Sequence, residues 1–342
     1  MLSQTKKTKA RLLASALALI LLFSLAACSG SNAPSGNGGN ASPTPSAQGG
    51  NTPAPSDPGY EPLISPLATG QPDTAVFPTP TEEYDPYGGM TTEDLRSRVE
   101  ERYGVTIIWG GEEVFVETGP PWNEEPCSNL EFLRQSLMIM DEQLALYPEG
   151  FFRQMPETYF ILAECLRRAD GSVVQGFADS KKDYTAIFYT AADYAFEVRE
   201  WYGDGDIVAE AAIDFQSTLH HEIGHTVFEM TGFNGAGVFD YDEYFAILPD
   251  DFTPTIDIYD EKYKKYIPTD NVDQVYFCSL YAMTNPMEFM AELFCLSMKP
   301  SLNWTFASPH IQAQLKLFFG AIREAYDSAD WPVQTYWERA LR

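Results

Sequence analysis

The most informative stretch of this chain is His221-Glu222-Ile223-Gly224-His225. It matches the pattern H-E-x-x-H, and in an α-helix a spacing of four residues places both imidazoles on one face, with Cβ atoms about 5–6 Å apart. That separation suits two nitrogens that bind one Zn²⁺ at about 2.0–2.1 Å each. Glu222 lies one step round the helix, where its carboxylate can accept a proton from a water that the metal activates. The pattern therefore predicts a zinc site with a general base beside it.

The residues around the motif predict a helix independently of it. Apolar side chains recur at helical spacing along Ile207–Met230, namely Ala209, Ile213, Leu219, Ile223, Val227 and Met230. Because the pattern has only three fixed letters, the alternative is a helix whose two histidines pair with nearby acids. The buried face expected for this segment favours the zinc site.

A catalytic zinc site needs a third protein ligand and one open position. In the metzincin pattern a glycine and a histidine follow the motif at set positions, but this chain has Phe228 and Thr231 there. We therefore exclude the metzincin class and expect the third ligand to be an acidic residue on another helix.

The segment Tyr281–Phe294 is the best source of that ligand. Asn285 favours an N-cap and Pro286 favours the first helical position, so Glu288 falls in the first turn and shares a helix face with Glu292. Two alternatives remain open. Either Glu288 is the ligand, or Asn285 and Glu288 form a capping box and Glu292 is the ligand.

The two segments together resemble a known family. The chain resembles the catalytic domains of anthrax lethal factor and of the secreted bacterial Pro-Pro endopeptidases. The first matching motif is H-E-x-G-H. The second lies downstream of it and consists of Tyr281, Thr284-Asn285, Glu288-Phe289, Ala291-Glu292 and Phe294. The match covers only His221–His225 and Tyr281–Phe294. It implies a zincin-like metallopeptidase domain of the glutamate-zincin group, in which His221, His225 and Glu288 bind one Zn²⁺.

The resemblance also implies roles for three residues around the metal. Glu222 would be the general base and later the proton donor. Tyr281 would donate a hydrogen bond to the substrate oxygen as charge develops on it, an interaction typically worth about 10²–10³ in rate. Glu292 would accept the free N–H of a zinc-bound imidazole, and its alternative is a solvated surface carboxylate.

The N-terminus has the layout of a bacterial lipoprotein. Residues 1–27 combine a basic start with the apolar run Leu12–Phe23, and Leu25-Ala26-Ala27-Cys28 resembles the lipoprotein cleavage box. We expect Cys28 to be lipidated, which would make this an exported, membrane-anchored lipoprotein on the extracellular or periplasmic side. The alternative is an ordinary leader followed by an incidental cysteine. Residues 28–88 are rich in Ser, Gly, Asn and Pro and predict a disordered linker.

Residues 89–342 predict one α+β domain with a small sheet, an active-site helix and a helical C-terminal half. A helix is expected after Thr91, where Leu95, Val99 and Tyr103 recur at helical spacing, and a strand over Val105–Trp109. The other expected strands are Tyr159–Leu166, Val173–Phe177 and Ala186–Thr190. The other expected helices are Leu130–Tyr147, Pro286–Met298 and Ile311–Ser328.

Several features outside the two motifs receive weaker predictions. Gly232–Gly237 and the acidic, aromatic run Asp240–Phe245 are expected to form a helix C-cap and a surface connection, with a loop bordering the cleft as the alternative. Asp240, Asp242, Asp250 and Asp251 leave a calcium site open, although no EF-hand pattern is present. His220 faces away from the motif histidines and is expected to be a structural or cleft residue, and His310 receives no role.

The four cysteines after Cys28 leave two alternatives open. They form two disulfide bonds, as the expected exported location allows, or they remain buried thiols, because a domain of this size does not need disulfide bonds for stability. These cysteines are Cys127, Cys165, Cys278 and Cys295.

The charge balance restricts the partners of this chain. The chain has 49 acidic and 22 basic residues and a formal charge of −27. This charge excludes electrostatic binding to the phosphate backbone of a nucleic acid, so no nucleic-acid partner is expected. We expect the substrate to be a peptide or protein, and we expect the chain to be a monomer.

The sequence as a whole predicts an exported, lipid-anchored zinc endopeptidase. One alternative is a non-catalytic zinc-binding surface lipoprotein that binds a peptide or cell-wall partner, and another is the solute-binding lipoprotein of a transporter. Glu222 and Tyr281 favour the enzyme, because a structural zinc site needs neither. The sequence does not predict the cleavage preference.

Overall fold

A computed structural model describes residues 86–109, 122–168, 173–180, 184–190, 207–232, 235–255, 260–299 and 303–342. These residues belong to one compact unit, Asp85–Arg342. The predictions for the leader 1–27, for Cys28 and for the linker up to residue 85 lie outside them. Within the described ranges, no helix has the length and apolarity to cross a bilayer.

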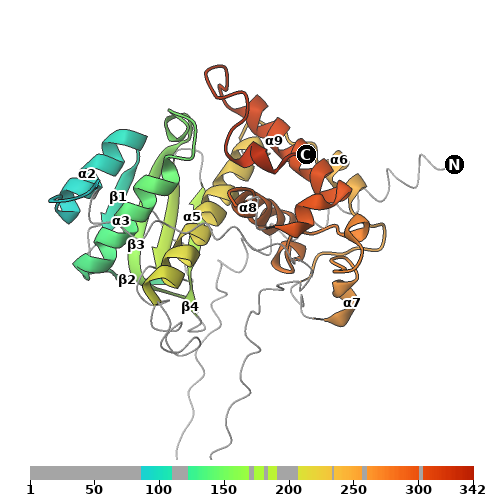
Figure 1. Cartoon of the computed structure of the whole chain (residues 1–342), viewed down its shortest axis with the longest axis horizontal. Helices are drawn as coiled ribbons and strands as arrows, with labels where there is room; N and C mark the ends of the chain where they lie inside the picture. Colours follow the sequence, from blue (N-terminus) through green and yellow to red (C-terminus); the bar gives the residue numbers. More distant parts are fainter. Residues whose placement is uncertain are drawn as a thin grey trace, which may run out of the picture. The chain divides into compact units, whose positions relative to one another are not determined.

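The described helices and strands alternate in the first half, and helices dominate the second half (Figure 1). The first half contains α2 (Thr92–Tyr103), β1 (Thr106–Trp109), β2 (Trp122–Pro126), α3 (Leu130–Leu144), β3 (Glu157–Arg168), β4 (Val173–Val174), β5 (Gly176–Ser180) and β6 (Tyr184–Thr190). The second half contains α5 (Ile207–Thr231), α6 (Tyr241–Ile247), α7 (Glu261–Lys264), α8 (Pro286–Ser297) and α9 (Pro309–Ala325). Short 3₁₀ turns include η3 (Tyr281–Met283) and η6 (Trp337–Ala340). The predicted α+β class, with a small sheet and a helical C-terminal half, is confirmed.

The sheet has the strand order β1-β3-β6-β5, with β2 and β4 paired to β3 beside this path. Strands β1, β3 and β6 are parallel, whereas β5 runs antiparallel to β6. In Figure 1 the sheet lies on the left with α2 and α3, the helical second half lies on the right, and α5 stands between them. Strand β5 therefore ends the sheet and packs against α5.

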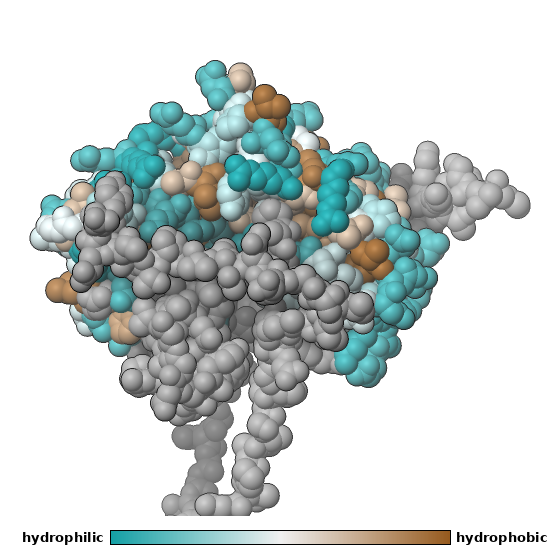
Figure 2. Space-filling view, viewed as in Figure 1, coloured by the Kyte–Doolittle hydropathy of each residue, from teal (hydrophilic) through white to brown (hydrophobic). Residues whose placement is uncertain are grey.

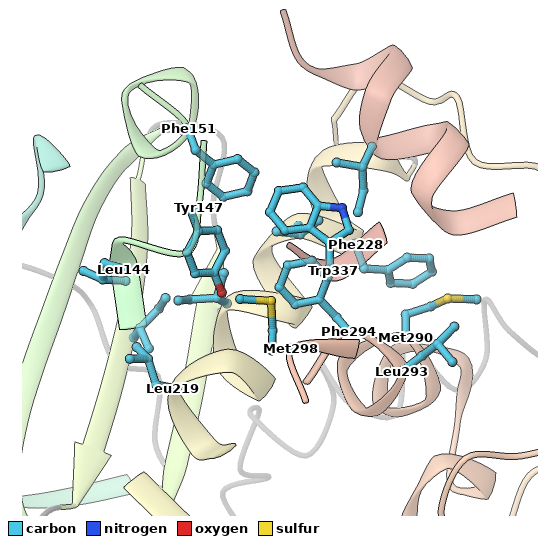
Figure 3. Packing of buried hydrophobic residues seen from close by; sticks show 14 of the residues in the cluster. Leu144, Tyr147, Phe151, Leu219, Phe228, Met290, Leu293, Phe294, Met298 and Trp337 are labelled. Carbon is cyan, nitrogen blue, oxygen red and sulfur yellow. The ribbon is translucent and has the colours of Figure 1, made fainter. Parts of the chain in front are cut away.

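The main core lies where one face of the sheet meets the helices. Strand residues alternate between faces, so Ile107 and Phe160 enter the main core, whereas their neighbours Ile108 and Ile161 join a smaller cluster on the other face. Aromatic rings link the two halves, with Tyr147 5.8 Å from Trp337 between ring centroids (Figure 3). Burial of each such large side chain contributes about 1.5–3 kcal/mol, so this core holds α5 rigidly.

Two local predictions are corrected by the structure. The run Asp240–Phe245 was expected to be part of a surface connection, but most of it belongs to helix α6, which the Asp240 carboxylate caps by accepting the Glu243 N–H at 2.9 Å. The expected strand Val173–Phe177 is split at Gln175 into β4, which pairs with β3, and β5, which pairs with β6. In both places, contacts with distant segments outweigh the local pattern.

Other boundaries differ from the predictions by a few residues. Helix α9 begins at Pro309 rather than Ile311, because the Ser308 hydroxyl caps it. Tyr87 falls within the predicted linker 28–88 but is buried, and its hydroxyl donates to Asp141 at 3.3 Å. The folded unit therefore starts slightly before the predicted boundary.

The described surface is mostly hydrophilic in the view of Figure 2, with small separate hydrophobic spots. This agrees with the excess of acidic residues in the chain. Among the large apolar side chains that are exposed, Tyr281 stands out, because it belongs to one of the two motifs.

Candidate metal centre

The N-terminus of α8 places Glu288 opposite the two motif histidines. The Asn285 side-chain oxygen accepts the N–H groups of Met287 at 2.8 Å and Glu288 at 3.0 Å, and Pro286 occupies the first turn. The Glu288 carboxylate turns towards α5, where its Oε2 lies 3.2 Å from His221 Nε2. Asn285 is thus a simple N-cap, and the Glu288 side chain points at the histidines instead of completing a capping box.

Three donor atoms converge between α5 and α8. Glu288 Oε2 is 3.2 Å from His221 Nε2 and 3.4 Å from His225 Nε2. One ligand atom from each of the three residues lies within 4.8 Å of the other two. In a tetrahedral zinc site with bonds of about 2.0–2.2 Å, ligand atoms are about 3.3–3.6 Å apart. The His₂Glu donor set therefore fits one Zn²⁺, and it is the one such cluster in the described part of the chain.

The electrostatics of this cluster favour a bound cation. Burial lowers the pKa of the His221 imidazole, but its hydrogen bonds to Glu288 and Glu292 outweigh burial and raise the pKa well above its usual value. Burial raises the pKa of Glu288, but His221 and His225 outweigh it and hold that pKa well below its usual range. Carboxylate charge thus accumulates where the two imidazoles point, and a proton or a metal ion neutralises it.

Glu292 and Ser279 hold His221 from behind. Glu292 Oε1 lies 2.9 Å from His221 Nδ1, and Glu292 Oε2 accepts the Ser279 hydroxyl at 2.6 Å. The Ser279 oxygen in turn accepts the N–H of Ala282 at 3.1 Å in η3. A carboxylate on Nδ1 leaves Nε2 free for a metal, so the position of Glu292 favours a supporting role over that of third ligand, and its side chain is largely buried rather than solvated. Ser279 was not predicted from the sequence, because it lies outside both motifs.

His225 lacks a comparable support. Its Nδ1 is buried and has no hydrogen-bond partner among the described residues. Its ring lies edge-on to that of His221, with centroids 4.8 Å apart. The two imidazoles are therefore held unequally: both contact Glu288 through Nε2, but only the Nδ1 of His221 has a carboxylate partner.

Glu222 lies on the side of α5 that faces the sheet. Its side chain is buried, and burial raises the pKa of its carboxyl above the usual value, while His221 and His225 oppose that rise. Residue Gly176 of β5 lies directly against it, because a Cβ built on Gly176 would be 2.7 Å from Glu222 Oε1. The carboxylate thus sits beside the metal cluster without belonging to it, as a general base requires.

Tyr281 is at the mouth of the cluster. Tyr281 belongs to the η3 turn and is 40% exposed to solvent. Its ring centroid lies 6.0 Å from that of His221. Burial, followed by the negative charge of Glu288, raises the pKa of the phenol well above its usual value. The hydroxyl is therefore protonated at neutral pH, and it interacts with the Glu288 carboxylate. The structure brings together all the residues predicted for the site: Glu222, Tyr281, His221, His225, Glu288 and Glu292.

The two remaining histidines have structural surroundings. His220 is fully buried, with its Nδ1 2.9 Å from the Tyr147 hydroxyl and its Nε2 3.0 Å from Gln143 Oε1. Burial lowers the pKa of His220 to about 3 and keeps it neutral, which agrees with its expected structural role. His310 stacks on Tyr276 with ring centroids 3.9 Å apart.

The cysteines and the acidic run form no further site in the described residues. Cys127, Cys278 and Cys295 are buried free thiols, which excludes a pair of bridges made from the four expected cysteines. The acids proposed for calcium have other partners, since Asp240 caps α6 and Asp251 pairs with Lys265 at 2.5 Å.

Comparison with known proteins adds little. No family model matches the chain, and no curated protein matches it in sequence. A solved structure from Bacteroides caccae, described as a "putative zinc-binding metallo-peptidase", is similar over 68% of this chain and 90% of its own, with 15% identity and a TM-score of 0.37. These values are too low to support an argument about fold family or activity, so the functional conclusion rests on the cluster itself.

Proposed function

We propose that residues 85–342 form a zinc-dependent endopeptidase domain. The observation that carries this proposal is that ligand atoms of His221, His225 and Glu288 meet within 4.8 Å of one another, with Glu222 and Tyr281 beside them. A structural zinc site is closed by four protein ligands, whereas a catalytic site has three and an open position. Three donors with an adjacent buried carboxylate and an exposed phenol match the catalytic kind.

The chain's own residues supply the groups that peptide hydrolysis needs. Zinc held by this donor set would lower the pKa of a water from 15.7 to about 7 and polarise a carbonyl. Glu222 accepts the proton of the attacking water and then donates it to the leaving amine. Tyr281 donates a hydrogen bond to the oxygen on which negative charge develops. No covalent intermediate is required.

The sheet edge supports a peptide as substrate. Among the described strands, β5 is paired only with β6, and Gly176 at its start touches Glu222. An extended peptide that adds to this edge as a further strand would pass the metal cluster with its main chain hydrogen-bonded. We therefore propose a peptide or protein substrate, with no nucleic-acid partner and with the domain acting as a monomer.

The lethal factor and Pro-Pro endopeptidase resemblance supports the role of each residue in this proposal. It rests on the two motifs, and it does not extend to a cleavage preference. The leader and the box around Cys28 support the further proposal that the enzyme is exported and anchored to a membrane by lipid, facing the extracellular or periplasmic side.

The proposal is tested by a mass-spectrometric cleavage profile of a broad peptide library. The zinc-loaded full chain is compared with Glu222→Gln, and Glu229→Gln on the same helix serves as the matched control. We expect the wild type and Glu229→Gln to cut the same bonds, and Glu222→Gln to lose about 10²–10⁴ in rate while it keeps one zinc, because only the general base is removed.

Three outcomes contradict the proposal in different ways. A zinc-loaded wild type that cuts no peptide favours the non-catalytic zinc-binding lipoprotein. Equal cleavage by wild type and Glu222→Gln removes Glu222 from the mechanism. Zinc at one equivalent with unchanged affinity in Glu288→Gln would show that the third ligand is a different residue.

A further inference from the structure

Strand β5 crosses α5 at the position of the general base. At one end of the strand, Gly176 lies against Thr218 and Glu222, and at the other end the Ser180 hydroxyl donates to Thr226 Oγ1 at 3.2 Å. The strand is held from its other side by antiparallel pairing with β6, where Gly176 is opposite Tyr189. The start of β5 is therefore fixed against the helix on which Glu222 stands.

The contact at Gly176 leaves no space for a side chain. A Cβ there would lie 2.5 Å from Thr218 Cγ2, 2.7 Å from Glu222 Oε1 and 2.9 Å from Glu222 Cγ. All three distances are far shorter than ordinary van der Waals separations of about 3.5–4.0 Å. A side chain at this position would have to displace Thr218, Glu222 or the strand.

Backbone conformation does not explain the glycine. The described glycines with positive φ are Gly89, Gly104, Gly150 and Gly237, so Gly176 has a backbone that any residue can adopt. Glycine inside a strand costs roughly 0.5–1 kcal/mol relative to alanine, and it commonly marks a close approach of the backbone to another group. Here the group approached is the Glu222 carboxylate.

Glu222 has little freedom to move away from such a contact. Its neighbours Leu219 and Ile223 are fully buried in the core, so the backbone of α5 is fixed, and the Glu222 side chain is itself buried. We propose that Gly176 is a positioning residue for the general base: the bare backbone of β5 forms one wall of the Glu222 side chain and directs its carboxylate towards the metal cluster. The inference rests on the proposed peptidase function.

The first test substitutes Gly176→Ala in the zinc-loaded full chain, with Gly320→Ala as the matched control. Nothing lies within 4 Å of a Cβ built on Gly320, which is in α9. We expect Gly176→Ala to lower kcat by about 10–100-fold, since a misplacement of about 1 Å costs this much. KM and zinc content should stay unchanged, because the contacts of the new Cβ are with Thr218 and Glu222 and not with the three proposed metal ligands. Gly320→Ala should match the wild type.

A double variant separates displacement of the base from general strain. Thr218→Ser removes Cγ2, the nearest obstacle, and keeps the hydroxyl that donates to Gln175 Oε1 at 3.4 Å. Gly176→Ala with Thr218→Ser should regain thermal stability but keep the low kcat, because the contact with Glu222 remains. A return of kcat to the wild-type value in this double variant would overturn the proposal.

Crystal structures of Gly176→Ala and the double variant give a readout that is independent of activity. The Glu222 carboxylate should be displaced from its wild-type position relative to His221 and His225, with the histidines unmoved. An active Gly176→Ala enzyme with wild-type kcat, or an unmoved Glu222, would refute the positioning role alone. A wild type without peptidase activity would instead refute the proposed function, and this inference with it.

Discussion

Helix α5 is packed differently on its two sides. Towards α8, a Cβ on Gly224 would lie 2.9 Å from Ala291 Cα and 3.1 Å from the Ala291 carbonyl oxygen, so the obstacle is backbone. Towards β5, a Cβ on Gly176 would meet the side chains of Thr218 and Glu222. The first glycine allows two helices to approach, and the second allows a strand to approach one carboxylate.

The difference separates two tasks of the site. The α8 side brings the Glu288 carboxylate to the two histidines and adds Glu292 behind His221. The β5 side contacts Thr218, Glu222 and Thr226, none of which belongs to the three-donor cluster. Metal binding and proton transfer therefore depend on different packing contacts, and substitutions should impair them separately.

The largest effect is expected from Gly224→Ala. Because backbone atoms of Ala291 cannot rotate away, α8 must move from α5 and carry Glu288 with it. We expect zinc affinity to fall by more than about 100-fold, which exceeds the usual cost of losing a residue that supports a metal ligand. Overpacking should also lower the free energy of unfolding by about 1–3 kcal/mol. Chelator competition and thermal unfolding measure both. Unchanged zinc affinity would show that the two sides of α5 are not specialised.

Tyr281→Phe should reduce activity without affecting the metal. Removal of one donor to a developing oxyanion costs about 10²–10³ in kcat. Zinc content and KM should remain as in the wild type, because the hydroxyl is the only group removed and the ring still packs near His221. Steady-state kinetics on a peptide identified in the library test this. A loss of zinc instead would make Tyr281 part of the metal-holding side.

Glu292→Gln should weaken zinc binding by about 10–100-fold, since the amide no longer fixes the tautomer of His221. Ser279→Ala should have a smaller effect in the same direction, because Ser279 acts on His221 only through Glu292. Zinc titration of the two variants in parallel gives the order. If Ser279→Ala weakens zinc binding more than Glu292→Gln does, then Ser279 supports the site mainly through its hydrogen bond to the η3 turn that carries Tyr281.

The smallest effect on the site is expected from Asp141→Ala, because this carboxylate pairs with arginines of α2 and not with residues of α5. Burial raises the pKa of Asp141, but Arg98 at 2.9 Å and Arg102 at 2.9 Å outweigh it and hold the pKa below its usual 3.8. The stability that this carboxylate provides is complete above pH 3.8 and is lost as the pH falls through the lower folded-state pKa. Near neutral pH the variant should lose about 1.5–3 kcal/mol of stability.

Denaturant unfolding of Asp141→Ala and the wild type at neutral and acidic pH measures this contribution. The gap between the two proteins should narrow as the pH drops, while zinc content and kcat per folded molecule stay equal at neutral pH. A change in zinc affinity would show that the contacts of α2 and α3 reach the metal cluster.

Much of the fold was predictable because its signals are local. The period of apolar residues predicted the helix Ile207–Met230, and the structure has Ile207–Thr231. Asn285 and Pro286 predicted the start of α8 through their backbone preferences. The α6 helix was missed because its Asp240 cap stands in a run whose acids and aromatic rings suggested a surface loop.

The residues of one motif were enough to predict a metal site, because H-E-x-x-H needs only the geometry of a single helix. The choice of Glu288 over Glu292 needed the tertiary structure, since both carboxylates share a face of α8 and only the approach to α5 tells them apart. Ser279 and Gly176 act through contacts with residues far away in sequence. Glycine within the expected strand Val173–Phe177 was a signal that its backbone approaches another group.

The sequence by itself determined which residue types the site contains and which helices carry them, because helical periodicity and capping are set by neighbours along the chain. Only the tertiary structure decided which carboxylate faces the histidines, which imidazole is supported, and which strand touches the base. Those contacts join residues as far apart in sequence as Gly176 and Glu222, or His221 and Glu292. They follow from how α5, α8 and β5 pack around one core, which no local pattern of residues specifies.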